Sequence, residues 1–252
     1  MGAKGKIGLI GLAVMGANLA RNLAGHGIST VVYNRSHDKT ENFLKEFGSD
    51  TNLSGAAALE ELVNSLEKPR KIILMIKAGE AVDAMIAKLI PLLEKDDSFF
   101  EDTRRRSREM EALGVHFVGM GVSGGEEGAL HGPSLMPGGT REAYDALAPI
   151  LKAVSAKAEG EACVDYMGPD GAGHYVKMVH NGIEYADMQM IADTYFVMKN
   201  VLGMTAEEMA DTWEMWNKGE LSSYLVEITA RILRKADEMT GKPLVDVILD
   251  GA

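Results

Sequence analysis

The pattern of apolar positions divides the chain into two parts with different periodicities. Over residues 1–171, short runs of consecutive apolar residues alternate with helical patterns. The first run, 6–10, reads as a buried strand, and a helical pattern over 18–25 leads to a second run over 29–33. Buried runs separated by helices are typical of parallel sheets. We therefore predict an α/β domain over 1–171, with a Rossmann-like doubly wound sheet.

The remainder of this first part repeats the alternation, with one irregularity. We predict further strands over 71–76 and 115–120, and helices over 81–93, 103–113 and 141–152. Another parallel strand is expected before the helix at 103, but residues 96–102 contain only two apolar side chains. A buried strand normally has a longer apolar run. Part of the expected strand is therefore missing or unusual here.

Helical periodicity fills the second part of the chain. A glycine-rich segment, 168–173, precedes it and is the predicted domain boundary. A helical pattern without proline runs over 172–201, and shorter helical patterns and a terminal segment follow at 205–217, 222–238 and 244–249. Thr205 and Glu208 have the spacing of a capping box. We predict an all-α helical domain over 172–252.

The long helical pattern carries two different faces. Its polar face has the spacing i, i+3, i+4, i+7 and i+8, and consists of Lys177, His180, Asn181, Glu184 and Tyr185. A separate apolar stripe consists of Val176, Val179, Ile183, Ala186 and Met190. The polar face is either a solvated surface or a row of acid–base groups that point into a cleft. The spacing alone does not distinguish the two.

Composition narrows the classes of protein. The 252 residues are 46% hydrophobic and 25% charged, which suits one large or two modest domains with real cores. A net charge of −11 argues against non-specific binding to nucleic acid or to an anionic membrane. The single cysteine, Cys163, excludes an intramolecular disulfide, and no apolar run approaches the ~18 residues of a membrane span. We expect a cytoplasmic protein.

A glycine motif follows the first predicted strand. Residues 11–16 read GLAVMG, which matches G-x-A-x-x-G between a strand and a helix. Gly11 permits a tight turn, Ala13 lets the backbone approach a pyrophosphate, and Gly16 lets the helix pack closely on the strand. The helix N-terminus adds N–H groups and its dipole. The motif and its context predict a dinucleotide site.

Three further segments lie where ligands bind at the carboxyl ends of strands. Asn34-Arg35-Ser36 replaces the acidic residue typical of NAD enzymes, and a guanidinium suits a 2′-phosphate, so NADP is favoured over NAD; an ordinary turn residue is the alternative. Lys77 and Ala78 follow the strand over 71–76. The segment 121–125 ends in Ser-Gly-Gly, whose amides can bind a carboxylate or phosphate, unless it is a plain flexible loop.

The chain resembles the 6-phosphogluconate dehydrogenase family over nearly every residue. The resemblance rests on the segments GLAVMG, NRS, MIKAG, GVSGGEEGAL, MPGG, GHYVKMVHNGIEY, WNKGELSSYL and KPLVDVILD. It implies a homodimeric enzyme that decarboxylates 6-phospho-D-gluconate oxidatively to ribulose 5-phosphate and CO2, reducing NADP+ without a metal. By resemblance, Lys177 is the general base and Glu184 the acid. The implied substrate contacts are Ser123, Gly124, Gly125, His180, Asn181 and, on the phosphate, Tyr185. The implied NADP contacts are Gly11, Leu12, Ala13, Val14, Met15, Gly16, Asn34, Arg35, Ser36, Ile76, Lys77 and Ala78.

Two departures from the family pattern bear on activity. The family carries an apolar strand that ends in Gly-Gly-Asn just before the residues matching 98–103, and this chain lacks that segment. The family also continues for about as long again through a helical domain, which supplies cations for the phosphate and a tail for the partner subunit. We expect the chain as written to bind NADP but to turn over 6-phosphogluconate poorly. A truncated NADP-binding or assembly module and a smaller β-hydroxyacid dehydrogenase are the alternatives, and Tyr185 within GIEY disfavours the second.

Overall fold

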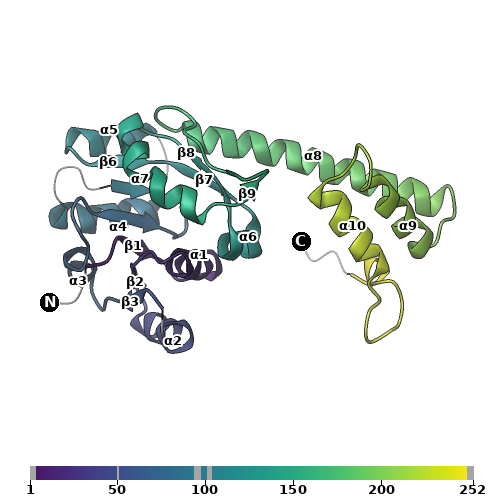
Figure 1. Cartoon of the computed structure of the whole chain (residues 1–252), viewed down its shortest axis with the longest axis horizontal. Helices are drawn as coiled ribbons and strands as arrows, with labels where there is room; N and C mark the ends of the chain where they lie inside the picture. Colours follow the sequence, from purple (N-terminus) through teal and green to yellow (C-terminus); the bar gives the residue numbers. More distant parts are fainter. Residues whose placement is uncertain (1–3, 50, 94–97, 101–103, 249–252) are drawn as a thin grey trace. The chain divides into compact units, whose positions relative to one another are not determined.

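The chain forms two compact units, Met1–Val179 and His180–Ala252. The computed structural model describes residues 4–49, 51–93, 98–100 and 104–248. One long helix, α8 (Ala172–Asn200), contributes its first residues to the first unit and the others to the second (Figure 1). Each unit has its own buried core.

A six-stranded parallel sheet forms the centre of the first unit, in the order β3-β2-β1-β4-β5-β6. The strands are β1 (Ile7–Ile10), β2 (Thr30–Tyr33), β3 (Leu53–Gly55), β4 (Lys71–Leu74), β5 (Ser98–Phe100) and β6 (His116–Val118). The order reverses between β1 and β4. This is the strand order of a Rossmann sheet, whose ligands bind outside the carboxyl ends of the strands at the reversal. The predicted fold class is confirmed.

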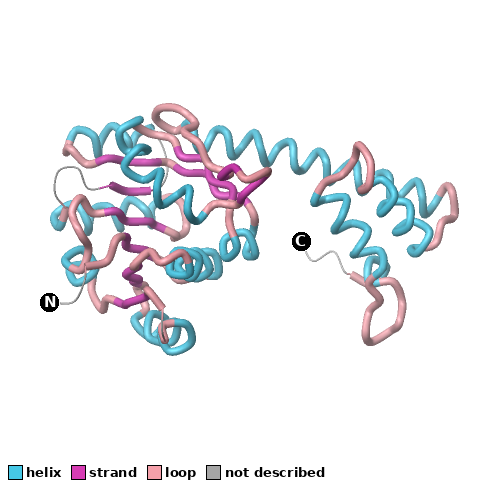
Figure 2. Tube along the Cα trace, viewed as in Figure 1, coloured by secondary structure: helices cyan, strands magenta, loops and turns pink. Residues whose placement is uncertain are grey.

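Helices cover both faces of this sheet (Figure 2). They include α1 (Val14–Gly25), α2 (His37–Phe47), α3 (Leu59–Asn64), α4 (Glu80–Leu89) with the 3-10 turn η1 (Ile90–Leu92), α5 (Arg104–Ala112) and α7 (Arg141–Val154). Neighbouring residues of β1 point to opposite faces. Leu9 therefore packs in the core with α1 and α7, whereas Ile10 packs in the core with α3 and α4. Burial on both faces explains why the central strands β1 and β4 are almost continuously apolar.

The irregular segment after α4 still supplies a strand. β5 has three residues and pairs with both neighbours, so that Phe99 lies between Ile72 of β4 and Phe117 of β6. Three residues are enough to keep the sheet continuous, because they pair with β4 on one side and with β6 on the other. The sheet is continuous at this position. The predicted start of the next helix, at 103, lies outside the described residues.

The chain leaves the parallel sheet after β6. We predicted one strand over 115–120, and this is wrong: β6 ends at Val118, and β7 (Met120–Ser123) pairs with β8 (Ser134–Pro137) in a separate antiparallel sheet. Gly119 lies between the two strands, and its carbonyl accepts a hydrogen bond of 2.9 Å from the Gly138 N–H beside β8. The short helix α6 (Gly125–His131) and a small hairpin of β9 (Lys157–Ala158) and β10 (Glu161–Ala162) complete this unit.

The second unit contains the rest of α8, α9 (Ala206–Trp216), α10 (Tyr224–Arg234) and the 3-10 turn η2 (Leu244–Asp246). The predicted capping box of α9 is confirmed, since the Glu208 N–H donates to Thr205 Oγ1 and the Thr205 N–H donates to Glu208 Oε2. α10 ends four residues earlier than predicted because the chain at Ala236 forms an antiparallel bridge with Pro243. Among the described helices, none combines the length and apolarity needed to cross a membrane.

Candidate active site

The glycine loop after β1 packs tightly against the end of β4. Gly11 has a φ of +105°, and a methyl carbon added to it would lie 2.3 Å from the carbonyl oxygen of Met75. A methyl carbon added to Gly16, on α1, would lie 2.0 Å from the carbonyl oxygen of Gly11. Real carbon–oxygen contacts are never so short, so both positions require glycine. The loop, the start of α1 and the end of β4 thus form one close-packed corner.

The N-terminus of α1 is open at this corner. Its first turn follows Ala13, which makes no side-chain cap, and contains no acidic residue. Ala13 and Val14 are exposed. The first N–H groups of a helix have no partner within the helix, and they carry the positive end of its dipole. The residues present therefore fit the pyrophosphate of a dinucleotide.

The segment after β2 lies beside the glycine loop. The N–H of Leu12 donates to Asn34 Oδ1 at 3.1 Å, and the amide nitrogen of Asn34 donates to the carbonyl of Ser36 at 3.2 Å. Asn34 therefore connects the first predicted cofactor segment, the glycine loop at 11–16, to the second, 34–36. Arg35 is exposed at the carboxyl end of β2, at the position where an NAD enzyme commonly places its acidic residue.

The third predicted cofactor segment, 76–78, follows β4, and an arginine of α5 bonds the residue after it. Ile76 is half-buried, and its Cγ2 would lie 2.9 Å from a methyl carbon on Gly11; Lys77 and Ala78 are exposed. The three consecutive arginines at 104–106 have the sequence pattern of a solvated helix face. That interpretation is wrong for Arg106, because its side chain is only 4% exposed. Arg106 donates to Asp83 on α4 and to the carbonyl of Gly79.

Two asparagines that sequence reasoning missed connect the cofactor helix to the predicted substrate loop. Asn18 on α1 donates to the carbonyl of Glu126 at 3.1 Å, and Asn22 donates to the carbonyl of Ala129 at 3.1 Å, both on α6. The helix α6 begins at the end of the Ser-Gly-Gly turn, where Gly124 has a φ of +130°. The spacing of the two asparagines, i and i+4 on a partly apolar helix, was a signal that could have indicated them.

Lys177 lies close to the strand that leads into this turn. A methyl carbon added to Gly121, on β7, would lie 2.5 Å from Cβ of Lys177. One helical turn earlier, a methyl carbon on Gly173 would lie 2.1 Å from the carbonyl oxygen of Met136 and 2.4 Å from that of Gly119. The first turns of α8 therefore pack directly on the backbone of β7 and β8. Lys177 is half-buried there. Gly121, against which it packs, lies two residues before Ser123 on β7.

The other predicted residues of α8 belong to the second unit. His180 Nδ1 lies 3.6 Å from Glu184 Oε2 and 3.4 Å from Asn181 Oδ1. The side chains of His180 and Glu184 are 38% and 40% exposed, and Tyr185 is 70% exposed. An imidazole and a carboxylate one turn apart on a rigid helix can share or exchange a proton.

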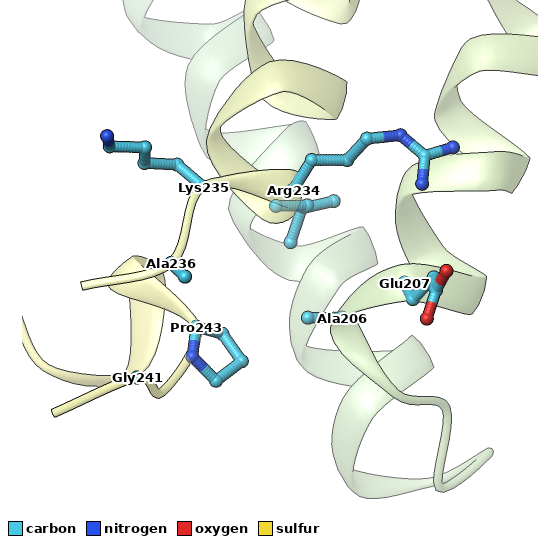
Figure 3. Close-up of a pocket in the computed structure, with 8 residues that line it drawn as sticks. Ala206, Glu207, Arg234, Lys235, Ala236, Gly241 and Pro243 are labelled. Atoms are coloured by element: carbon cyan, nitrogen blue, oxygen red, sulfur yellow. The ribbon is translucent and has the colours of Figure 1, made fainter. Parts of the chain in front are cut away.

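No predicted site residue lines either of two cavities in the described part of the structure. One, of about 450 Å³, lies in the first unit and is lined by residues that include Lys152, Cys163 and Val176. The other, of about 340 Å³, lies in the second unit beside Arg234, whose guanidinium extends toward α9 (Figure 3). Arg234 is held there by Glu214. Among the described residues, no group of three or more His, Cys, Asp or Glu side chains is placed to hold a metal.

Comparison with known proteins identifies related sequences along almost the entire chain. Residues 6–168 match the NAD binding domain of 6-phosphogluconate dehydrogenase, and residues 173–252 match the C-terminal domain of the same enzyme. The chain is 60% identical to the NADP(+)-dependent, decarboxylating 6-phosphogluconate dehydrogenase of Bacillus subtilis, covering 99% of this chain and 55% of that protein. The chain thus spans about half the length of the curated relatives it matches. That alignment extends over 257 positions, at least five more than the 252 residues here, so some positions of the relative have no counterpart.

Solved structures show the same relationship. A structure of Plasmodium falciparum 6-phosphogluconate dehydrogenase superimposes with a TM-score of 0.93 at 46% identity, covering 97% of this chain and 54% of that one. A 3-hydroxyisobutyrate dehydrogenase of Mycobacterium tuberculosis superimposes with a TM-score of 0.69 at 20% identity, covering 98% and 81%, which shows a common fold alone. By its sequence and its structure, the chain belongs to the 6-phosphogluconate dehydrogenase family.

Proposed function

We propose that this protein oxidises and decarboxylates 6-phospho-D-gluconate to ribulose 5-phosphate and CO2, with reduction of NADP+. The observation that carries the proposal is the packing of Lys177 on Gly121, which puts an amine-bearing helix against the strand that ends in Ser-Gly-Gly. The family membership supports the same activity. A β-hydroxyacid dehydrogenase of the smaller kind is not favoured, because the similarity to that class is limited to the fold.

The cofactor in this proposal is NADP, held by the corner between β1, β2 and β4. The open N-terminus of α1 would bind the pyrophosphate, and Arg35 would bind the 2′-phosphate in place of the usual acidic residue. The other proposed contacts are Gly11, Leu12, Ala13, Val14, Met15, Gly16, Asn34, Ser36, Ile76, Lys77 and Ala78. Bound NADP+ supplies the hydride acceptor for the oxidation at C3 of the substrate.

Two side chains of α8 would move the protons of the reaction. Neutral Lys177 would accept the proton of the C3 hydroxyl as C3 is oxidised to a carbonyl. Protonated Lys177 would then polarise that carbonyl, so that the electron pair left by the departing CO2 is held on the C3 oxygen as an enolate. Return of the proton from Lys177 to this oxygen gives the enediol. Glu184, two turns further along α8, would donate a proton to the carbon that carried the carboxylate, which is C2 of 6-phosphogluconate and becomes C1 of ribulose 5-phosphate. Ser123, Gly124, Gly125, His180 and Asn181 would hold the sugar acid, and Tyr185 its phosphate.

The test is a steady-state assay of the purified chain beside titrations with NADP+ and NAD+. The expected result is slow NADPH formation that requires 6-phosphogluconate, with release of one CO2 for each NADPH. Binding of NADP+ without turnover would support the alternative of an NADP-binding module. Reduction of NADP+ by 3-hydroxy acids that lack a phosphate, in preference to 6-phosphogluconate, would contradict the proposed substrate.

We further infer that two copies of the chain associate. The support is the number of large apolar side chains that α8 leaves exposed, which include Tyr175, Met178, Ile183 and Phe196, each at least 60% exposed. Exposed apolar surface of this extent is typical of interfaces. Light scattering should give a mass of twice 27.2 kDa, and Phe196→Glu should shift the protein toward the monomer. A monomer at all concentrations would contradict the inference.

A further inference from the structure

Arg106, the buried arginine of α5, contacts the residue that follows the third predicted cofactor segment, 76–78. We propose that Arg106 is a positioning residue for NADP: it holds the carbonyl of Gly79 and the first turn of α4, so that Lys77 and Ala78 are ordered for cofactor binding. The inference rests on the proposed cofactor function. It concerns residues of the first unit only.

The contacts of Arg106 join α5 to the start of α4. Its Nε donates to Asp83 Oδ1 at 2.8 Å, and its Nη2 donates to Asp83 Oδ2 and to the carbonyl oxygen of Gly79, both at 3.0 Å. The planar guanidinium thus binds a carboxylate with two nitrogens and a backbone carbonyl with one of them. Its side chain is 4% exposed, so the alternative of solvation by water is not open to it. Hydrogen bonds from Arg106, and then from Arg105, hold the pKa of Asp83 well below its ordinary value.

Gly79 is the residue at which the chain turns from the cofactor segment into α4. Its φ is +96°, and its carbonyl also accepts a hydrogen bond of 3.0 Å from the N–H of Val82. Apart from its two chain neighbours, no described heavy atom lies within 4 Å of the position of a Cβ on Gly79. Packing on this side therefore does not fix the turn. Hydrogen bonds to its carbonyl fix it instead, and Arg106 makes one of them.

The cofactor segment is anchored at both ends but not in its middle. Ile76 packs against Gly11 at one end, and Gly79 is bonded by Arg106 at the other. Lys77 and Ala78 between them are exposed. Without the second anchor, the segment would have to be ordered when the cofactor binds, which costs backbone conformational entropy. The loss should appear in affinity for NADP before it appears in the fold.

The neighbouring arginine provides a matched control. Arg105 also binds Asp83, with 2.8 Å between Nη2 and Oδ1, and its other partner is Glu109 on its own helix. It is 56% exposed. Arg105→Gln therefore removes the same charge and a contact with the same carboxylate, while the bond from Arg106 to Gly79 is kept. The comparison separates the positioning of the loop from general attraction of the cofactor by positive charge.

The experiment measures NADP affinity by calorimetry and backbone amide exchange of 76–82 by mass spectrometry, for the full chain and its variants. We expect Arg106→Gln to raise the Kd for NADP about tenfold, with faster exchange of 76–82 in the absence of NADP. We expect Arg105→Gln to change the Kd less than about threefold, and Arg106→Lys, which keeps the charge without the planar fork, to give an intermediate Kd. Melting curves identify variants that are folded at the temperature of the titration.

Equal Kd values and equal exchange for Arg106→Gln and Arg105→Gln would overturn the proposal. Should Arg106→Gln fail to fold, Arg106→Lys and Arg105→Lys are compared in the same way, and equal values there overturn it. Failure of the unaltered chain to bind NADP would instead contradict the proposed cofactor. In that case the exchange of 76–82 still decides whether Arg106 orders the loop.

Discussion

Substitution of Gly16 by alanine tests how closely the cofactor helix must approach the glycine loop. The new methyl carbon would lie 2.0 Å from the carbonyl oxygen of Gly11 and 3.1 Å from Cβ of Met75. Contacts shorter than 3.0 Å are essentially never observed, so α1 must move from the loop by at least about 1.0 Å, the difference between 3.0 and 2.0. The start of α1 would move with it, because a helix is a rigid element.

The consequence for NADP follows from hydrogen-bond geometry. An N–H···O bond of about 2.9 Å that lengthens by about 1 Å is no longer a hydrogen bond. Each bond to a charged phosphate contributes about 1.5–3 kcal/mol, so the loss of one should weaken NADP binding about ten- to a hundredfold. Overpacking should also destabilise the fold by about 1–3 kcal/mol, less the gain of up to about 1 kcal/mol from replacing glycine in a helix.

Calorimetric titration with NADP+ and thermal melting measure the two effects separately. Gly25→Ala is the matched control, because Gly25 is the last residue of the same helix and nothing lies within 4 Å of the position of its Cβ among the described residues. We expect Gly25→Ala to bind NADP like the unaltered protein. If Gly16→Ala also binds NADP unchanged, the start of α1 is not the phosphate site.

Three further predictions concern charge and proton transfer. Arg35→Ala should weaken NADP far more than NAD, since only NADP carries the 2′-phosphate; equal losses in a titration with both cofactors would contradict the assignment. Lys177→Met should abolish NADP+ reduction while NADP binding survives, and Glu184→Gln should spare the oxidation more than overall turnover; near-native reduction by Lys177→Met in rapid mixing would identify another base. Hydrogen bonds from the Thr205 N–H and hydroxyl lower the pKa of Glu208 below its usual 4.5. The stability that Glu208 contributes should therefore be complete above pH 4.5 and be lost as the pH falls through the lowered pKa. Melting curves of Glu208→Gln and the unaltered protein should converge in acid, and a constant difference would refute this.

The cofactor corner could be predicted from the sequence because its determinants are local. Gly11 and Gly16 are five residues apart, and the strand, turn and helix that contain them follow one another without interruption. Arg35 needed only its place at the end of the next strand. The sheet order also follows, because right-handed crossovers leave few arrangements for successive βαβ units. Structural features that depend on a short stretch of sequence can therefore be predicted from the sequence.

The contacts of Arg106 could not be predicted for the opposite reason. In the sequence it is the last of three consecutive arginines and looks like part of a charged helix face. Its burial depends on Asp83 and Gly79, which lie 23 and 27 residues earlier and meet it only when α4 and α5 pack together. The same limit applies to Asn22, whose amide nitrogen also bonds the carbonyl of Val154, 132 residues away. Such roles require the packed structure.

The glycine-rich segment before α8 shows that composition alone does not separate a flexible linker from a tight junction. The N–H of Gly139 donates to the carbonyl of Gly168 at 3.0 Å, and the N–H of Gly138 donates to the carbonyl of Gly119 at 2.9 Å. A methyl carbon on Gly138 would lie 2.5 Å from the nitrogen of Gly173. These glycines let three backbone segments approach within contact distance, which any side chain would prevent. Lys177 follows Gly173 by one helical turn, so the strands of the first unit set the position of its backbone and Cβ through these close contacts.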